Sequence, residues 1–212
     1  MSCPQCVGAD RVFSGFYVAR ELKSYRRKGP RATTTMLVEA LKAEDIEGST
    51  LLDIGGGVGA IQHELLRAGA SRATGADAAA AYLQATREEA ERQGHAERIE
   101  YRHGDFVQIA GDLESADVVT LDRVICCYHD MEALVDASVE KARRLYGVVY
   151  PRDVWWTRVS NGFLNFFFWL LRNPFRVFVH SSRDVDALVR GAGFRRQYTR
   201  MTPFWQVVLY KR

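Results

Sequence analysis

The chain of 212 residues suits one domain with an extended terminus, and its 47% hydrophobic and 26% charged residues are typical of a globular protein. A net charge of +3 is too small by itself to indicate a nucleic-acid-binding protein. Residues 1–10 lack the basic start and apolar core of a secretory signal, so we expect a cytoplasmic protein with reduced cysteines.

Two helices are expected before the first strand. They cover residues 12–25 and 33–43, and a basic stretch that ends in Gly29-Pro30 separates them. The basic stretch is short, and a solvated helix end explains it as well as a binding surface does. Residues 1–49 are therefore interpreted as a helical unit that precedes the sheet.

The segment around residue 55 carries the most specific pattern in the chain. An apolar strand at 50–54 contains Asp53 and runs into glycines at positions 55, 56, 57 and 59, and a helix is expected at 58–68. Glycine lets the backbone turn sharply and lets a ligand approach the main chain closely. Four glycines within five positions cost backbone entropy, which favours a ligand-binding loop over a plain turn.

Strand-like and helix-like runs then alternate as far as residue 150. Strands are expected at 72–76, 98–102, 116–121 and 145–150, and helices at 79–93 and 131–144. This alternation is typical of a parallel sheet with helices on both faces. Near the end of the chain, Ser181 and Asp184 form a capping-box pattern for a short helix. Two strands, at 194–199 and 204–210, follow it.

An aromatic insertion at about residues 152–180 interrupts the alternation, and a helix is expected within it at 155–171. Its apolar run at 163–171 is only nine residues long, whereas a helix that spans a bilayer needs about twenty. Phenylalanine occurs at more positions than one face of an exposed helix displays. The aromatic side chains line a cavity, pack in the core or touch a membrane surface, and core packing is the simplest of these interpretations.

The pattern Asp53-x-Gly55-x-Gly57-x-Gly59 resembles the first motif of the class I S-adenosylmethionine-dependent methyltransferases. The resemblance implies an α/β fold: a Rossmann-like, doubly wound sheet of seven mostly parallel strands with an antiparallel C-terminal strand. It also implies a methyltransferase domain at residues 50–212. In this arrangement residues 1–49 form an N-terminal lid and the aromatic insertion caps the substrate cavity.

A second family motif fits part of the same loop. Gly55-x-Gly57-x-x-Ala60 matches the dinucleotide fingerprint, in which a helix N-terminus receives a pyrophosphate. A carboxylate at Asp53 would weaken pyrophosphate binding, but it suits a positively charged amino-acid group. A nicotinamide-dependent oxidoreductase is therefore the alternative enzyme. The alternative outside the enzymes is a module that binds S-adenosylmethionine without catalysing a reaction.

The resemblance implies a set of residues that hold S-adenosyl-L-methionine and its product S-adenosyl-L-homocysteine. Asp77 would bind the ribose hydroxyls, Asp105 and Phe106 would hold the adenine, and the first motif would surround the methionine part. Each of these roles has a structural alternative. Asp77 would instead be a helix N-cap, and residues 105–106 would be a capped turn with a core phenylalanine. The predicted cofactor-binding residues are Asp53, Gly55, Gly57, Gly59, Asp77, Asp105, Phe106 and Asp122.

The predicted catalytic residues, Arg123, Tyr128 and His129, follow the fourth strand of the sheet. In the family this segment passes beneath the transferable methyl group, and open α/β sheets bind ligands at the carboxyl ends of their strands. His129 has a suitable pKa for a general base, and Tyr128 would orient the methyl acceptor. A structural histidine is an equally good interpretation of His129.

The methyl acceptor is expected to be a small, partly apolar molecule. Enzymes that methylate base amines usually carry Asn/Asp/Ser-Pro-Pro-aromatic in the fourth motif, but residues 121–124 read Leu-Asp-Arg-Val, and no Pro-Cys pair is present for attack on cytosine. The aromatic insertion also resembles, weakly, that of the magnesium-protoporphyrin O-methyltransferases, which esterify a propionate. Arg123, Arg152 or Arg158 would suit such a carboxylate.

The cysteines do not form a standard metal motif. Cys3-Pro4-Gln5-Cys6 has the spacing of half a zinc site, but Cys126-Cys127 is too tight to supply the usual second half. We therefore predict no metal. A joint role of the two pairs, in metal binding, thiol chemistry or metalloid methylation, is open if the N-terminus folds over the strand ends.

Overall fold

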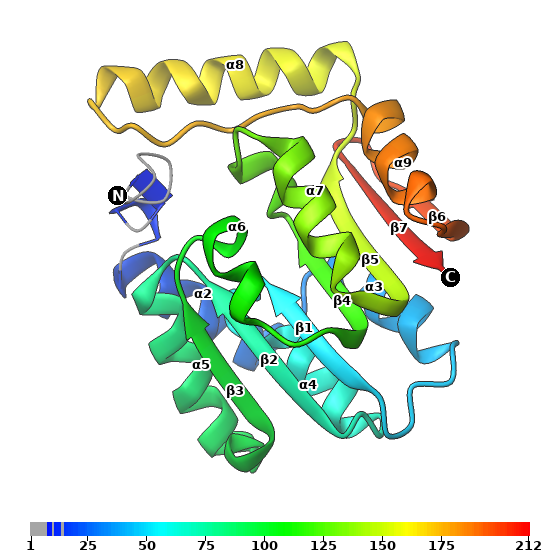
Figure 1. Ribbon diagram of the computed structural model, residues 1–212. Helices are drawn as coiled ribbons and strands as arrows, with labels where there is room; N and C mark the ends of the chain where they lie inside the picture. The colour runs from blue at the N-terminus through cyan, green and yellow to red at the C-terminus, as the bar shows by residue number, and fades with distance from the viewer. Residues whose placement is uncertain (1–7, 10, 14) are drawn as a thin grey trace.

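The computed structural model describes residues 8–9, 11–13 and 15–212, and its strands form one twisted sheet (Figure 1). The order across the sheet is β3-β2-β1-β4-β5-β7-β6. Strands β1 to β5 are parallel, and β7 runs antiparallel between β5 and β6. The predicted Rossmann-like fold with an antiparallel C-terminal strand is therefore confirmed. The strands are β1 (Thr50–Ile54), β2 (Arg72–Asp77), β3 (Ile99–His103), β4 (Ala116–Asp122), β5 (Ala142–Pro151), β6 (Arg195–Met201) and β7 (Trp205–Lys211).

The helices follow the predicted order, with boundaries that differ by a few residues. They are α2 (Gly15–Lys28), α3 (Ala32–Lys42), α4 (Ala60–Arg67), α5 (Ala80–Gln93), α6 (Phe106–Ile109), α7 (Met131–Glu140), α8 (Trp155–Leu170) and α9 (Ser182–Gly191). Three short 3-10 turns are η1 (Ala96–Arg98), η2 (Ala110–Asp112) and η3 (Ile125–Cys127). The predicted capping box is confirmed, because the Ser181 side chain accepts a hydrogen bond from the backbone N–H of Asp184 at the start of α9.

The prediction of a helix at 131–144 was wrong for its last four residues, 141–144. Helix α7 ends at Glu140, and β5 already begins at Ala142, which pairs with Ala116 of β4. Residues 141–144 read Lys-Ala-Arg-Arg, and all of these residue types favour helices. Pairing with β4 overrides this local preference, since the backbone N–H of Ala116 bonds the carbonyl of Lys141.

Hydrophobic side chains cover both faces of the sheet. Along β5, Val148 packs on the α7 and α9 side and Val149 on the α3 and α4 side, as the alternation of a strand requires. Leu37 and Leu41 place α3 in the second of these layers. A Cβ atom at Gly147 would lie 2.8 Å from a methyl carbon of Leu37, so this glycine permits the close approach of α3 to β5. Helix α3 is thus part of the core.

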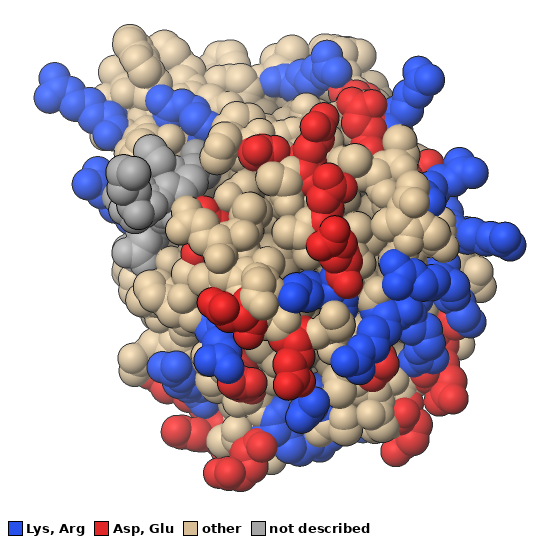
Figure 2. Space-filling model, in the orientation of Figure 1, with Lys and Arg blue, Asp and Glu red and all other residues tan. Residues whose placement is uncertain are grey.

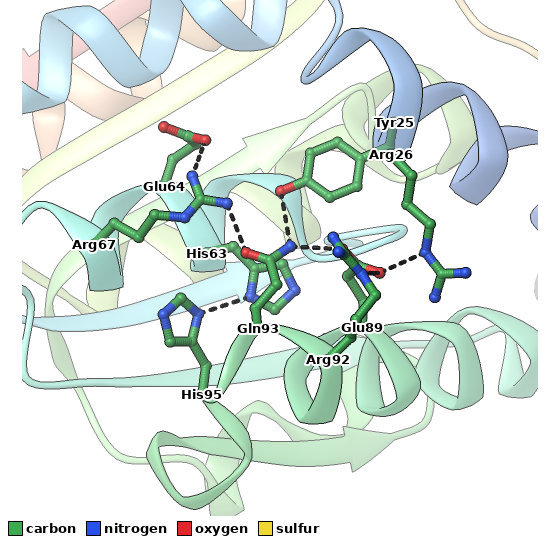
Figure 3. Close-up of polar contacts among 9 residues, drawn as sticks. All are labelled: Tyr25, Arg26, His63, Glu64, Arg67, Glu89, Arg92, Gln93 and His95. Atoms are coloured by element: carbon green, nitrogen blue, oxygen red, sulfur yellow. Dashed lines mark hydrogen bonds and ion pairs between the residues drawn. The ribbon is translucent and has the colours of Figure 1, made fainter.

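Helix α2 lies over α4 and α5 and is held there by a polar network (Figure 3). The buried carboxylate of Glu89 on α5 accepts a hydrogen bond of 2.8 Å from Arg26 of α2. Tyr25 stacks on His63 with 6.4 Å between ring centroids, and His63 Nδ1 lies 3.1 Å from His95 Nδ1. One ring nitrogen of this histidine pair donates and the other accepts, so the accepting ring is neutral.

Helix α8 lies across the top of the molecule in Figure 1, and the segment that follows it runs back beneath it. Among its residues only Thr157 is buried. The interpretation that its aromatic side chains pack in the core was therefore wrong for most of them. Within the part of the chain that the structure describes, no helix combines the length and apolarity needed to cross a membrane.

We predict that His63 makes stability depend on pH. Burial, and then the charge of His95, lowers the His63 pKa to about 4, whereas an unfolded histidine titrates near pH 6.5. Between these values the unfolded state binds more protons, so the contribution of His63 is complete above pH 6.5 and is lost as the pH falls to 4. Its full size is about 3 kcal/mol, since a difference of one in pKa is worth about 1.4 kcal/mol.

Urea unfolding of the wild type and His63→Asn at several pH values checks this prediction. The difference in unfolding free energy should shrink steadily from pH 7 to pH 4, since the carboxyl groups titrate alike in both proteins. A difference that does not change with pH would contradict the assignment.

Candidate functional site

A cavity of about 970 Å³ lies at the carboxyl ends of the parallel strands, where α/β sheets commonly bind ligands. Its floor is the glycine loop between β1 and α4, and its walls include the ends of β2 and β4. Side chains of α2 and of α8 close it from above. The predicted residues on its wall are Gly55, Gly57, Asp77, Asp105, Phe106, Asp122, Arg123 and Tyr128.

The glycine loop adopts backbone conformations that favour glycine. Gly55, Gly57 and Gly59 have φ angles of +62°, +57° and +75°. The backbone N–H of Gly55 bonds the carbonyl of Ala76 at 2.7 Å, which ties the loop to β2. A Cβ atom at Gly56 would clash with the carboxylate of Asp53, so the loop lies directly on that side chain.

Asp53 is fully buried beneath the loop and does not line the cavity. One carboxylate oxygen accepts a hydrogen bond of 2.7 Å from the Thr120 hydroxyl, and the other accepts one of 3.0 Å from the Gln62 amide. Thr120 is its direct partner across the β1–β4 pairing. Asp53 therefore supports the loop from below, and its contact with a ligand ammonium group stays a prediction.

Three carboxyl groups gather at the ends of neighbouring strands. Burial raises the pKa of Asp53 to about 7 and that of Asp77 to about 6, and it also raises the pKa of Asp122. The charges of Asp122 and Asp77 contribute to the shift at Asp53. Such a cluster attracts a cation and repels a pyrophosphate. The electrostatics of the site therefore favour a positively charged ligand over a dinucleotide.

Asp77 lies at the end of β2 and is not the N-cap of α5, which is Ala79; its ribose-binding role stays a prediction. Its Oδ1 accepts a hydrogen bond of 2.8 Å from the backbone N–H of Ala79, next to the start of α5. The same side chain lines the cavity. The bond from Ala79 fixes the carboxylate at the cavity wall.

Asp105, Phe106 and Tyr128 come together at one side of the cavity. Asp105 caps α6 by accepting from the backbone N–H of Val107, and it accepts the Tyr128 hydroxyl at 2.9 and 3.0 Å. Phe106 is buried and belongs to the core, as the structural alternative proposed, while also lining the cavity. The hydroxyl of Tyr128 therefore positions Asp105.

Arg123 has φ of +64°, a conformation that is uncommon for an arginine and costs backbone energy. Its guanidinium donates to the Thr33 hydroxyl at 2.6 Å and lies 4.8 Å from the centroid of the Trp205 ring. Its Nε and the Oδ1 of Asp122 are buried at the cavity without a hydrogen-bond partner. Asp122 also accepts a bond from the Thr34 hydroxyl.

The structure does not bring His129 to the cavity. Its ring contacts that of Tyr128, with 5.2 Å between centroids, and it is not part of the cavity lining. His180 approaches the same loop, with Nε2 2.9 Å from the Tyr128 carbonyl oxygen. The role of His129 as a base remains a prediction without a cavity contact to support it.

Two polar residues of α8 were missed by the sequence reasoning. Thr157 is 2% exposed, and both Thr157 and Asn161 line the cavity. The Thr157 hydroxyl and the Asn161 amide nitrogen are buried without a hydrogen-bond partner. Their spacing of four residues within an otherwise aromatic helix would have indicated a polar inner face.

Cys126 and Cys127 also line the cavity, as free thiols whose sulfur atoms lie 3.7 Å apart. Both approach the carbonyl oxygen of Arg123. The predicted pairing with Cys3 and Cys6 falls outside the described residues. Within the described ranges, no cluster of three metal-binding side chains occurs.

Comparison with known proteins identifies the central part of the chain. Residues 51–146 match the family described as a methyltransferase domain. Magnesium protoporphyrin IX methyltransferase from Synechocystis PCC 6803, crystallised with S-adenosylhomocysteine, has a similar structure with a TM-score of 0.77 and 18% identity, over 98% of this chain and 99% of that one. Mitomycin 7-O-methyltransferase has a TM-score of 0.63 and 22% identity, over 92% of this chain and 57% of that one. These likenesses establish the fold.

A curated relative matches a shorter part of the chain. Ribosomal protein L11 methyltransferase of Pectobacterium atrosepticum is 39% identical over 72 residues, which are 34% of this chain. The chain spans only 24% of the length of that relative. The match therefore concerns a shared domain and not the whole relative.

We predict that Gly56→Ala perturbs the site whereas Gly111→Ala does not. The new methyl group at 56 would meet Asp53 and Gln62, and such overpacking costs about 1–3 kcal/mol. A methyl group at 111 would meet no atom within 4 Å. Thermal denaturation of both variants checks the prediction, and equal melting temperatures would show that the loop does not rest on Asp53.

Proposed function

We propose that the protein is a class I S-adenosylmethionine-dependent methyltransferase that acts on a small, partly apolar molecule; the match of residues 51–146 to a methyltransferase domain supports this. The observation that carries the proposal is the cavity itself, in which a glycine loop and a cluster of carboxyl groups face an aromatic cap. The proposed compartment is the cytoplasm, where the thiols of Cys126 and Cys127 would stay reduced.

The residues of the site fit this cofactor. When bound, S-adenosylmethionine supplies a methyl group on a sulfonium, which a nucleophile displaces in line. Asp77 would accept the ribose hydroxyls, Asp105 and Phe106 would hold the adenine, and the loop carrying Gly55 and Gly57 would allow close approach of the methionine part. The carboxyl cluster favours the positive charge of the sulfonium, and for the same reason it disfavours a nicotinamide dinucleotide.

The far side of the cavity suits an acceptor with an apolar body and a polar group. Leu164, Phe168, Phe175, Val177 and Phe204 contribute apolar walls there. The unpartnered polar atoms of Thr157 and Asn161 lie in the same cavity, and they would bond a polar group of the acceptor.

One observation favours a second candidate, a carboxyl O-methyltransferase of the magnesium-protoporphyrin type. Arg123 lines the cavity, and its buried Nε makes no hydrogen bond but pairs with Asp122 Oδ1 at 3.9 Å; a carboxylate of the acceptor would bind there in place of this pairing. Arg152 contacts the Trp156 ring and the carbonyl of Thr202, and Arg158 pairs with Asp153. Of the three arginines considered, Arg123 is therefore the best placed.

A proton acceptor, where the reaction needs one, is best sought on the cavity wall. We propose Asp122, which lines the cavity, whose Oδ1 accepts no hydrogen bond, and whose pKa is raised by burial. His129 is the other candidate. The loop after β4 would have to change conformation before the His129 ring could reach the acceptor.

Transfer of a labelled methyl group to an extract of cell metabolites tests the function. We expect label in a solvent-extractable small molecule. Label in protein or nucleic acid instead would contradict the proposal. Binding of S-adenosylhomocysteine without any turnover would also contradict it and would indicate a non-catalytic module.

For a hydroxyl or amine acceptor, Asp122→Asn should lower turnover by a factor of about 100 or more. His129→Asn should change it less than Asp122→Asn does.

We predict that Thr157→Val separates acceptor binding from cofactor binding. Losing one hydrogen bond should lower kcat/KM for the acceptor by about threefold to tenfold, with an unchanged Kd for S-adenosylhomocysteine. The melting temperature should be equal or higher, because the buried hydroxyl has no partner in the protein. Thr157→Ser keeps the hydroxyl and should retain activity. Equal kcat/KM in the wild type and Thr157→Val would contradict this role.

A further inference from the structure

Helix α8 has the reverse of the usual polarity of a surface helix. Polar side chains lie on its inner side beside Leu164 and Phe168: Thr157 and Asn161 line the cavity, and Asn165 exchanges two hydrogen bonds of 2.8 Å with the backbone of Val177. Surface helices of globular proteins instead turn their apolar stripe inward. The polar side of α8 is therefore already used by the protein.

The outer side of α8 is apolar and exposed. Phe163 is 66% exposed and Trp169 is 63% exposed, values that leave most of each ring in contact with solvent. The exposed large hydrophobic side chains of α8 and its C-cap are Trp155, Trp156, Val159, Phe163, Leu164, Phe166, Phe167, Trp169, Leu170 and Leu171. A contiguous apolar surface of this kind on a globular protein marks a contact with a partner or a membrane.

Positive charge surrounds this apolar surface. Residues 152–180 contain four arginines, at 152, 158, 172 and 176, and the single acid Asp153. The net charge of this segment therefore equals that of the whole chain, +3. Figure 2 shows the upper rim, where α8 lies, as uncharged surface broken by basic side chains, with a column of acidic side chains only below it, over α7. Basic residues beside an apolar helix attract anionic lipid headgroups.

The chemistry of the face decides between a bilayer and a second copy of the chain. In a two-fold contact the same face would meet itself, and its excess of arginines would oppose an equal excess. The face is also rich in tryptophan, which is enriched where membranes meet water. A helix of 16 residues is about 24 Å long, too short to cross a hydrocarbon core of about 30 Å but able to lie along its surface.

We propose that α8 is a membrane-docking helix. Its outer aromatic and aliphatic side chains enter the headgroup region of an anionic bilayer, and Arg172 contacts lipid phosphates. The helix lies along the membrane plane, and its inner face remains the roof of the cavity. This docking does not depend on methyl transfer, so it can be tested separately from the proposed function.

Co-sedimentation of the full chain with phosphatidylcholine vesicles, with and without phosphatidylglycerol, tests the proposal. The wild type should bind the anionic vesicles, and high salt should weaken that binding. Phe163→Ser combined with Phe166→Ser should lower the partition coefficient by a factor on the order of ten or more, whereas the same two positions changed to leucine should bind nearly as well. Neither phenylalanine lines the cavity, so both double variants should melt like the wild type.

A matched pair of arginine variants tests the electrostatic part. Arg172→Gln, beside α8, should weaken binding to anionic vesicles by about fivefold. Arg72→Gln should not weaken it, because this exposed arginine lies at the amino end of β2, whereas α8 lies across the carboxyl ends of the strands (Figure 1). Absence of vesicle binding by the folded wild type would overturn the proposal. Dimerisation of the wild type that the serine variants abolish, again without vesicle binding, would assign the face to a second copy.

Discussion

The buried carboxyl group of Asp53 is the constraint on which the rest of the site depends. It lies under the glycine loop, and its hydrogen bonds to Thr120 and Gln62 join β1 to β4 and to α4. The loop passes so close above it that Gly56 has no room for a side chain. The shape of the cavity floor follows from this arrangement.

The two helical segments outside the sheet close the cavity in different ways. Helix α2 is fixed by polar contacts: Tyr82 donates to Glu21 at 2.6 Å, and Arg26 bonds the buried Glu89. Helix α8 contributes its polar side to the cavity and leaves its apolar side outside. Helix α8 thus lies between the acceptor region of the cavity and the surface that we propose contacts a membrane.

The fold and the cofactor loop were predictable because they depend on local patterns. Alternating strands and helices fixed the order of the elements, and the spacing of Gly55, Gly57 and Gly59 located the loop. The position of Asp53 under the loop was not predictable, because it depends on Thr120, which is distant in the sequence and adjacent in the sheet. The inversion of α8 was missed because aromatic content was taken as a sign of burial, whereas the spacing of Thr157 and Asn161 defines its inner side. Similarly, proximity in sequence to Tyr128 did not place His129 at the cavity.

The central claim is that this cavity binds S-adenosylmethionine at the carboxyl ends of β1, β2 and β4. Calorimetric titration with S-adenosylhomocysteine, with NADH as the parallel ligand, tests it most directly. The account predicts one site for S-adenosylhomocysteine, much weaker binding in a folded Asp77→Asn variant, and no binding of NADH. Binding of NADH instead, or S-adenosylhomocysteine binding that Asp77→Asn leaves unchanged, would contradict it.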